Sequence, residues 1–503
     1  MDPERSTAKL KSESSFSSTS LANSSLTTRE KFENIKGLGW FVTGLFVVGD
    51  LAGGGIVALP TSVIQTGFVP GILIMVVMTV IATFTSYLLG KSWCVLLEMW
   101  PEYREHTRKP YAEIGYRAYG DKMKTVVSIV GNVTQLMIAV VYIELSSKNI
   151  ADFIKTFFNY DVSFCLVIVV VAICLLPLTF LKSPNDFWWA VVIAMFTTTA
   201  AVILIIIGAS IDYGTCAPIR HLPEPHFTSY FLALGTILFS VGGHTAFPTI
   251  QHDMRRPYDF SKSTVVAFLI MGLMYIPTGA IGYLAYGGAL RESVINSIQT
   301  MWIQQAINIL ITVHLILTLT IVFNPLNQEA EEIFKVPHHF CWQRVVVRTS
   351  IMAVCVFIAE SVPSFGPLLN LAGGSTLTMS SIIFPCIFFI FLEARRRKAQ
   401  HMGTDDGPVT VKEVFRYNDR LVVIAAVVVI IVGIVGGIAA TFSALRDLTT
   451  VRFEPPCYLS SFYKYDSIGD SVLIGATNCC GPYQNVTSLE GVICTQPNLN
   501  FHS

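Results

Sequence analysis

The chain has 503 residues, of which 52% are hydrophobic and only 14% are charged, and its mean hydropathy is +0.57. Its 34 basic and 34 acidic residues balance to zero net charge, so it lacks both the basic excess expected of a nucleic-acid-binding protein and the acidic excess of a solvating tail. Because soluble proteins are about a quarter charged, this composition argues against a cytosolic enzyme and indicates a protein of the lipid bilayer.

Residues 1–36 are rich in serine and threonine and contain no apolar run, which predicts a disordered cytoplasmic tail rather than a signal peptide. Eleven apolar segments follow, each long enough to cross a bilayer. Their predicted limits are 38–65, 69–97, 125–147, 162–181, 187–211, 229–250, 264–286, 298–323, 345–361, 365–392 and 421–445. We therefore expect an all-α polytopic membrane protein with eleven transmembrane helices, in which residues 37–446 form the transmembrane domain.

The basic residues are distributed unequally between the two sides of the predicted membrane. Most of them lie in the amino-terminal tail and in the loops on its side, whereas the opposite loops carry only Lys148, Lys155, Arg220 and Arg291. The positive-inside rule then places the amino terminus in the cytoplasm, and an odd number of spans places the carboxyl-terminal tail outside the cell or in a lumen. We expect the plasma membrane, with an endolysosomal or vesicular membrane as the alternative.

The carboxyl-terminal tail, residues 447–503, has the features of a chain exposed to an oxidising compartment. It contains an Asn-Val-Thr glycosylation sequon at Asn485 and four cysteines, namely Cys457, Cys479, Cys480 and Cys494. Cys216, in a predicted outer loop, could join these cysteines or pair with Cys165. The sequence does not decide among the pairings.

Two of the apolar segments contain glycine clusters that predict breaks in their helices. Segment one carries Gly53, Gly54 and Gly55 in succession, and segment six carries the pair Gly242-Gly243. Glycine costs about 1 kcal/mol relative to alanine inside a helix, although small residues also serve close helix packing. Segments one and six are corresponding members of two five-span halves, residues 38–211 and 229–392. Because each half has an odd number of spans, the second half would enter the membrane in the opposite orientation. The halves would then be inverted repeats, as in many secondary transporters, with 421–445 as an extra helix.

Four stretches, in order along the chain, resemble the amino acid/auxin permease family, also called transmembrane amino acid transporters. They are GGGIVALP at 53–60, PYAEIGYRAYG at 110–120, GGHTAFPTIQ at 242–251 and NPLNQE at 324–329. The resemblance implies a LeuT-like fold with a 5+5 inverted repeat. It also implies symport of amino acids with protons or sodium ions. Asp50 departs from the neutral polar residue that many family members carry near this position, which leaves the coupling ion open.

Asp50 and His244 are the ionisable residues beside the predicted breaks. A carboxylate at this depth is costly unless it is paired or protonated, so Asp50 could take up a proton, lie beside a sodium ion or pair with the substrate ammonium. The alternative is a structural carboxylate bonded to a neighbouring span. His244 could carry a proton, or it could be a neutral hydrogen-bonding residue that shapes the unwound segment.

The related fold implies a sodium site between the break in segment one and segment eight, where Thr318 and Thr320 supply hydroxyls. Threonine is also a routine helix-packing residue, so this assignment has a plain alternative. Other ionisable residues in or near the spans are Glu144, His314, Glu360 and Lys91. We expect Glu144, Glu360 and Lys91 to reach toward the membrane surfaces from the ends of their spans.

The substrate is predicted to bind between the two breaks. The segment from Gly53 to Ile56 would hold its carboxylate, because the amides of Gly54, Gly55 and Ile56 lie at the start of a half-helix. The carbonyls from Ser240 to Gly243, beside His244, would accept its ammonium group. We expect a secondary active transporter of neutral amino acids that works by alternating access, with the lipid bilayer as its surroundings and no cofactor or metal.

Other functional classes receive less support from the sequence. The spans contain no HExxH metal motif and no GxSxG elbow, which argues against a membrane enzyme. A receptor or nutrient sensor is the stronger alternative, because a transporter fold could bind an amino acid and signal through the serine-rich tail.

Overall fold

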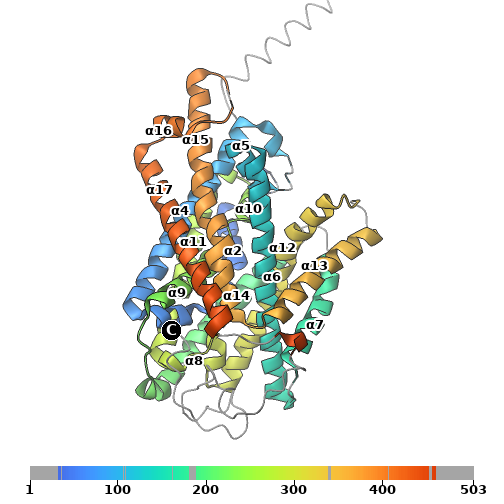
Figure 1. Ribbon diagram of the computed structural model, residues 1–503, viewed down its shortest axis with the longest axis vertical. Helices are drawn as coiled ribbons and strands as arrows, with labels where there is room; N and C mark the ends of the chain where they lie inside the picture. Colours follow the sequence, from blue (N-terminus) through green and yellow to red (C-terminus); the bar gives the residue numbers. More distant parts are fainter. Residues whose placement is uncertain are drawn as a thin grey trace, which may run out of the picture.

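The computed structural model describes residues 32–35, 37–105, 107, 109–160, 162–180, 188–337, 341–405, 407–451 and 456–459. These residues form helices that run mostly along the long axis of the molecule (Figure 1). The first five predicted segments are α2 (Trp40–Leu51) with α3 (Leu59–Thr66), α4 (Phe68–Met99), α6 (Asp121–Phe158), α7 (Phe164–Leu175) with η2 (Leu176–Phe180), and α8 (Trp188–Cys216). The next four are α9 (Phe227–Val241) with α10 (Phe247–His252), α11 (Phe260–Tyr286), α12 (Met301–Ile333) and α13 (Trp342–Ser361).

The tenth segment is one continuous helical rod with two π-helical stretches. It runs from α14 (Phe365–Ala372) through η8 (Gly373–Leu377) and η9 (Met379–Ile383) to α15 (Phe384–Met402). The eleventh segment is α17 (Arg420–Arg446). Short helices connect the segments, among them α5 (Pro110–Tyr119), η6 (Gly287–Ala289), η7 (Val294–Ser297) and α16 (Val411–Tyr417), and η11 (Cys457–Leu459) follows the eleventh segment.

All eleven predicted segments are helical within the described residues, but not all are single long helices. Seven helices there are long and apolar enough to cross a membrane, segments one, four and six give only shorter apolar helices, and segment nine, α13, is in neither group. Segments one and six are short because each is interrupted near its middle. The all-helical class and the membrane-spanning helices are thus confirmed, while the count of eleven spans and the 5+5 repeat stay predictions.

The extra helix α17 packs on the tenth segment through glycines. A Cβ on Gly437 would lie 3.0 Å from the Gly374 carbonyl oxygen, and one on Gly373 would collide with the Gly235 carbonyl oxygen of α9. Small residues let helix backbones approach in a lipid environment, where burial of apolar surface gives no drive for association. Thr236 of α9 adds a hydrogen bond of 2.6 Å to the Asn370 side chain of α14.

The end of the bundle that carries α5, α16 and the turn between α12 and α13 (Figure 1) also carries Arg117 and the run Arg395–Arg397, and we call it the basic end. There Glu331 of α12 forms buried ion pairs with Arg344 at 3.0 Å and Arg348 at 2.6 Å. Arg348 lies inside α13, within a predicted span. Its ion pair with Glu331 compensates the cost of burying the charge there.

One expectation for a span-end residue is wrong. Glu144 of α6 is only 1% exposed, so it does not reach the membrane surface. The expectations for Lys91 and Glu360 stay predictions: Lys91 lies over the ring of Tyr87, with Nζ 5.5 Å from the ring centre, and Glu360 is half-buried. An apolar helix gives no periodic signal for which face turns inward, which explains the error for Glu144.

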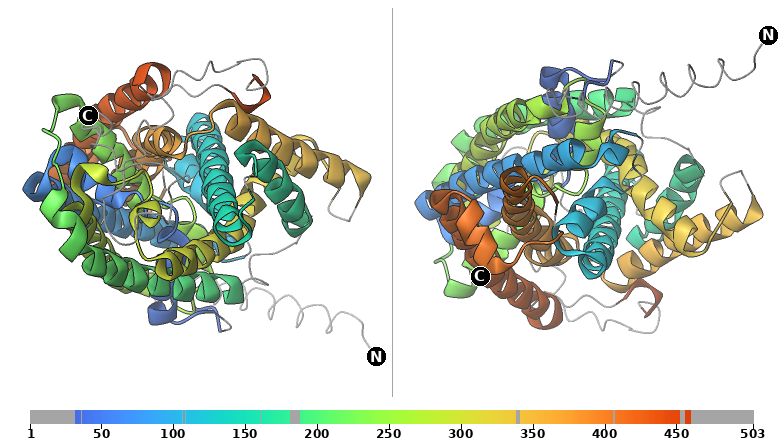
Figure 2. Two further views of the ribbon diagram at one scale, coloured as in Figure 1. Left: turned by 90° about the horizontal axis from the view of Figure 1, so that it is seen from below. Right: turned by 90° about the horizontal axis from the view of Figure 1, so that it is seen from above.

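A disulfide joins Cys165 at the start of α7 to Cys457 in η11, with the Cα atoms 5.8 Å apart. This bond lies at the end opposite the basic end, and α7 and α13 lie side by side at that flank of the bundle (Figure 2). The pairing excludes a Cys165–Cys216 bond, although Cys216 also takes part in a disulfide. Cys479, Cys480, Cys494 and Asn485 lie outside the described residues, so the predictions for them stand as made.

Candidate functional site

The first predicted break is present. Helix α2 ends at Leu51 and α3 begins at Leu59, and we call residues 52–58 break 1. Its chain follows loose turns in which the Ile56 amide donates to the Gly53 carbonyl at 3.2 Å and the Ala58 amide to the Gly55 carbonyl at 3.1 Å. Every residue from 51 to 66 is buried, and irregular backbone at membrane depth is tolerated only in such surroundings.

The second predicted break is present as well. Helix α9 ends at Val241 and α10 begins at Phe247, and we call residues 242–246 break 2. Gly242 and Gly243 are only half-buried, so the backbone of break 2 is less enclosed than that of break 1. The helix after each break has a proline in its first turn, Pro60 in α3 and Pro248 in α10. Backbone N–H groups in the first turn of a helix have no partner within it, so proline, which lacks an N–H, removes no hydrogen bond there.

The two breaks lie directly against each other. A Cβ on Gly55 would collide with the Ser240 hydroxyl and lie 2.8 Å from the Ser240 Cα, so only glycine permits this approach. The hydroxyl of Tyr275, in α11, donates to the Ser240 carbonyl at 2.9 Å and lies 3.5 Å from the Leu51 carbonyl. Tyr275 therefore joins the chain ends that lead into both breaks, a role the sequence analysis missed.

Asp50 occupies the last turn of α2, between the breaks. Its side chain is half-buried, and its Oδ2 atom lies 3.9 Å from the position that a Cβ on Gly243 would take. A carboxylate here lies beside break 2, where it would stabilise a cationic group.

Helix α6 presents two polar side chains to the breaks that the sequence analysis did not select. The Tyr142 hydroxyl accepts a hydrogen bond from the Gly54 amide of break 1, and Gln135 donates to the Thr245 hydroxyl of break 2 at 3.3 Å. The two positions are seven residues apart and therefore share one helix face. Polar side chains near the middle of an apolar span were the available signal.

His244 faces away from the space between the breaks. Its Nε2 atom lies 3.0 Å from the Thr85 hydroxyl, 2.8 Å from the Ser86 hydroxyl and 3.2 Å from the Ala82 carbonyl, all on α4. Both hydroxyls donate to that carbonyl, so they accept from a protonated Nε2, and the ring packs against Phe247. This geometry supports the alternative in which His244 is a neutral residue that fixes break 2 to α4.

The candidate sodium-site hydroxyls are bonded within their own helix. Thr318 donates to the His314 carbonyl at 2.9 Å, and Thr320 donates to the Leu317 carbonyl at 2.6 Å. Two residues apart on an α-helix means about 200° of rotation, so the two threonines cannot both face break 1. Thr318 shares the face of His314, which contacts Gly53. A sodium site at these threonines stays a prediction.

The predicted substrate-binding backbone is partly engaged in the structure. The Gly54 amide bonds to Tyr142, and the Ile56 amide bonds to the Gly53 carbonyl. Among the described residues, the Gly55 amide takes no part in the turns of break 1, which leaves it as the candidate donor to a carboxylate. The Ser240 carbonyl retains a second lone pair beside the bond from Tyr275.

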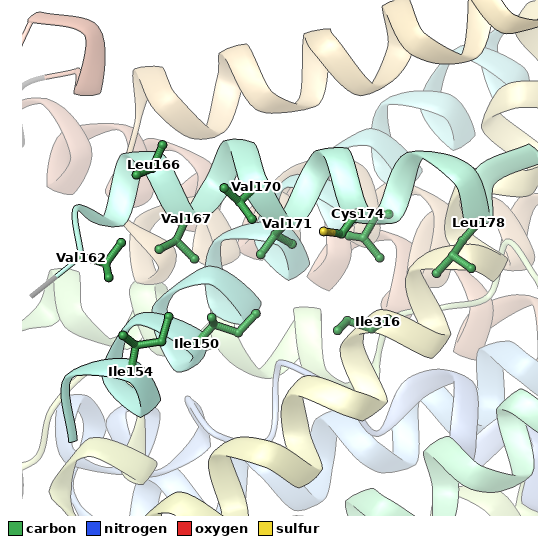
Figure 3. A pocket seen from close by; sticks show the side chains of 11 residues that line it. Ile150, Ile154, Val162, Leu166, Val167, Val170, Val171, Cys174, Leu178 and Ile316 are labelled. Atoms are coloured by element: carbon green, nitrogen blue, oxygen red, sulfur yellow. The ribbon is translucent and has the colours of Figure 1, made fainter. Parts of the chain in front are cut away.

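An apolar pocket outside the centre offers no comparable chemistry (Figure 3). It lies between α6, α7 and α12, and its lining consists of aliphatic side chains and Cys174, including Ile150, Leu166, Val170 and Ile316. An amino acid carries an ammonium and a carboxylate group, both of which need polar partners when they are buried. The breaks, and not this pocket, supply such partners.

Comparison with known proteins identifies the family of the chain. A family model described as "Transmembrane amino acid transporter protein" matches residues 36–438. Relatives from Arabidopsis thaliana include "Lysine histidine transporter-like 4", 22% identical over 71% of this chain and 82% of the relative, and "Amino acid transporter AVT1H", 27% identical over 68% of this chain and 79% of the relative. "Auxin transporter protein 1" from the same plant is 26% identical over 50% of this chain and 52% of the relative.

Two solved transporters share the fold. The structure of MhsT in complex with L-phenylalanine has a TM-score of 0.53 at 11% identity and covers 83% of this chain and all of that one. The inward-facing conformation of Mhp1 has a TM-score of 0.51 at 11% identity and covers 84% of this chain and 93% of that one. These likenesses concern the fold alone. With the family model spanning both breaks, the chain belongs to the transmembrane amino acid transporter family, a family of transporters rather than enzymes.

Proposed function

We propose that this protein is a secondary active transporter that carries neutral amino acids, driven by a proton or sodium gradient. The observation that carries the proposal is the contact of two broken helices at Gly55 and Ser240, with Asp50 beside both. In this arrangement the Gly55 amide binds the substrate carboxylate. Asp50 and the carbonyls of break 2 bind its ammonium group. Alternating access then requires the helices around the breaks to open to one side of the membrane at a time.

The preference for neutral amino acids rests on the side chains around the breaks. Leu145 and Leu377 approach Gly54 and Gly242, and Leu51 contacts Gly243. These apolar side chains offer no partner for a second charge on the substrate, and an unpaired buried charge is costly. A substrate with an uncharged side chain therefore fits this space best.

The distribution of charge supports the orientation proposed from the sequence. The basic end carries α16 and the Glu331 cluster, whereas the disulfide between Cys165 and Cys457 lies at the opposite end. Disulfides persist in oxidising compartments, so the disulfide end would face the outside or a lumen and the basic end the cytosol. We propose the plasma membrane as the site of action.

Transport by the purified full chain in proteoliposomes tests the proposal. Counterflow exchange of radiolabelled amino acids needs no gradient and identifies the substrates first. Accumulation under an imposed proton gradient, and separately under a sodium gradient, then identifies the driving ion. Binding without counterflow would contradict transport and favour the amino-acid sensor.

A further inference from the structure

His314 lies in the middle of α12, and its imidazole ring is fully buried. Helix α8 holds one side of the ring: Nδ1 is 3.1 Å from the Ala194 carbonyl oxygen and 2.7 Å from the Thr198 hydroxyl. A carbonyl oxygen can only accept a hydrogen bond, so these partners assign the hydrogen to Nδ1. The lone pair of the neutral ring is then on Nε2.

The Nε2 atom faces break 1. It has no hydrogen-bond partner among the described residues, although it is buried. A Cβ on Gly53 would lie 2.6 Å from Nε2 and 2.7 Å from the Tyr142 hydroxyl, so both polar atoms approach the same side of this glycine. A buried acceptor without a donor is unfavourable, and the atom is aimed at the backbone proposed to hold the substrate carboxylate.

The groups around His314 restrict what could occupy this position. From α6 the titratable group beside it is Tyr142, whose hydroxyl approaches the same side of Gly53 as Nε2. From α8 the facing groups are Thr198 and the Ala194 carbonyl, neither of which titrates. Sodium prefers oxygen ligands, whereas an imidazole nitrogen readily accepts a proton.

Resting on the proposed function, we propose that His314 binds the coupling proton and that its protonated Nε2 then donates a hydrogen bond to the substrate carboxylate at break 1. The proton forms the Nε2–H bond from water on the entry side, which makes the ring an imidazolium. Its charge pairs with the carboxylate, while Asp50 pairs with the ammonium group. When the site opens to the other side, the substrate leaves and Nε2 returns its proton to water there.

This chemistry couples the two fluxes. Without the proton, the Nε2 lone pair would face the negative carboxylate, and binding of the substrate alone is disfavoured. Without the substrate, a buried imidazolium lacks its carboxylate partner. The binding site therefore changes its access from one side of the membrane to the other only when it holds both the proton and the substrate, or neither. Symport requires this.

The test uses the purified full chain and the His314→Gln variant, since glutamine keeps a polar side chain but does not titrate. With one proton per substrate, a pH difference of about one unit supports an accumulation of about tenfold in wild-type proteoliposomes at zero membrane potential. The variant should lose accumulation under the pH gradient. Its counterflow exchange should be slower than that of the wild type, because an uncharged amide replaces the imidazolium partner of the carboxylate, and it should stay constant across the pH range in which wild-type exchange changes. His221→Gln, in an exposed loop, is the matched control and should keep the wild-type pH profile.

Each outcome separates the two proposals. Accumulation by His314→Gln equal to wild type under the pH gradient would overturn the assignment of His314. Wild-type protein that exchanges amino acids but accumulates them only under a sodium gradient would overturn it too, while leaving the proposed function intact. Wild-type protein without any counterflow would overturn the proposed function itself.

A measurement on the wild type keeps the inference testable if the variant does not fold. Substrate added to weakly buffered detergent-solubilised protein should cause uptake of about one proton per bound molecule, reported by a pH indicator, because binding of the two is linked. Substrate binding without proton uptake across the pH range where transport occurs would contradict the inference.

Discussion

The hydroxyl of Tyr275 donates a hydrogen bond to the backbone carbonyl of Ser240, 2.9 Å away, at the point where α9 gives way to break 2. The same hydroxyl lies 3.5 Å from the Leu51 carbonyl at the end of α2. The hydroxyl hydrogen thus satisfies the Ser240 carbonyl, while the Leu51 carbonyl accepts from the Gly53 amide at 2.8 Å, so Tyr275 lies between the ends of both interrupted helices.

Replacement of Tyr275 by phenylalanine should weaken this junction. The ring still fills its buried position, but the Ser240 carbonyl loses its donor, which costs about 1–3 kcal/mol. We expect a lower midpoint of thermal unfolding in detergent and a slower counterflow rate in proteoliposomes. Unchanged values for both would show that the hydroxyl does not support the breaks.

The close approach of the breaks predicts that Gly55→Ala abolishes transport. A Cβ at this position collides with Ser240, including its Cα, so the two backbones have to separate; overpacking of this kind costs about 1–3 kcal/mol. We expect the variant to reach the membrane and lose counterflow. Gly131→Ala is the matched control, because nothing lies within 4 Å of a Cβ there and alanine favours the α6 helix by about 1 kcal/mol. Equal transport by the two variants would contradict this packing argument.

Replacement of Asp50 by asparagine tests its proposed bond to the substrate ammonium group. Loss of a charge-assisted bond costs about 1.5–3 kcal/mol, which weakens apparent affinity roughly 10- to 100-fold. The measurement is the substrate concentration for half-maximal exchange. Asp121→Asn, at the exposed start of α6, should leave it unchanged. An Asp50→Asn variant with full affinity and full coupled uptake would assign Asp50 a structural role only.

His244 gives a contrasting prediction. Because its Nε2–H donates to groups on α4, a glutamine amide N–H can replace it, and His244→Gln should keep the pH profile of transport. His244→Ala removes these bonds and should lower the free energy of unfolding by about 1–3 kcal/mol. A pH profile altered by His244→Gln but not by His314→Gln would exchange the roles assigned to the two histidines.

The disulfide between Cys165 and Cys457 predicts both stability and sidedness. Loss of either cysteine removes the same bond, so Cys165→Ser, Cys457→Ser and the double variant should show similar loss of stability, of about 2–4 kcal/mol by analogy with soluble proteins. In intact cells, a membrane-impermeant maleimide should label the remaining cysteine of each single variant. Labelling only after the membrane is permeabilised would place this end inside the cell or within an organelle.

The sequence by itself determined the local features of this protein. Successive glycines disfavour a helix whatever surrounds them, so both breaks were predictable from Gly53–Gly55 and Gly242–Gly243. The apolar segments predicted the all-helical class, and four short motifs indicated the family. Both signals are stretches of neighbouring residues and do not depend on how the helices pack. Asp50 also stood out, because a carboxylate inside an apolar segment is rare wherever the segment packs.

Only the tertiary structure decided which side chains meet at the breaks. Tyr142, Tyr275 and His314 come from three helices far apart in the sequence, and Glu144 turns inward although it lies near a span end. His244 follows a break yet points to α4. In a membrane helix every face is apolar, because lipid tails are as apolar as the protein core, so periodicity does not report which face turns inward. The contacts between helices supply that information, and with it the roles of the two histidines.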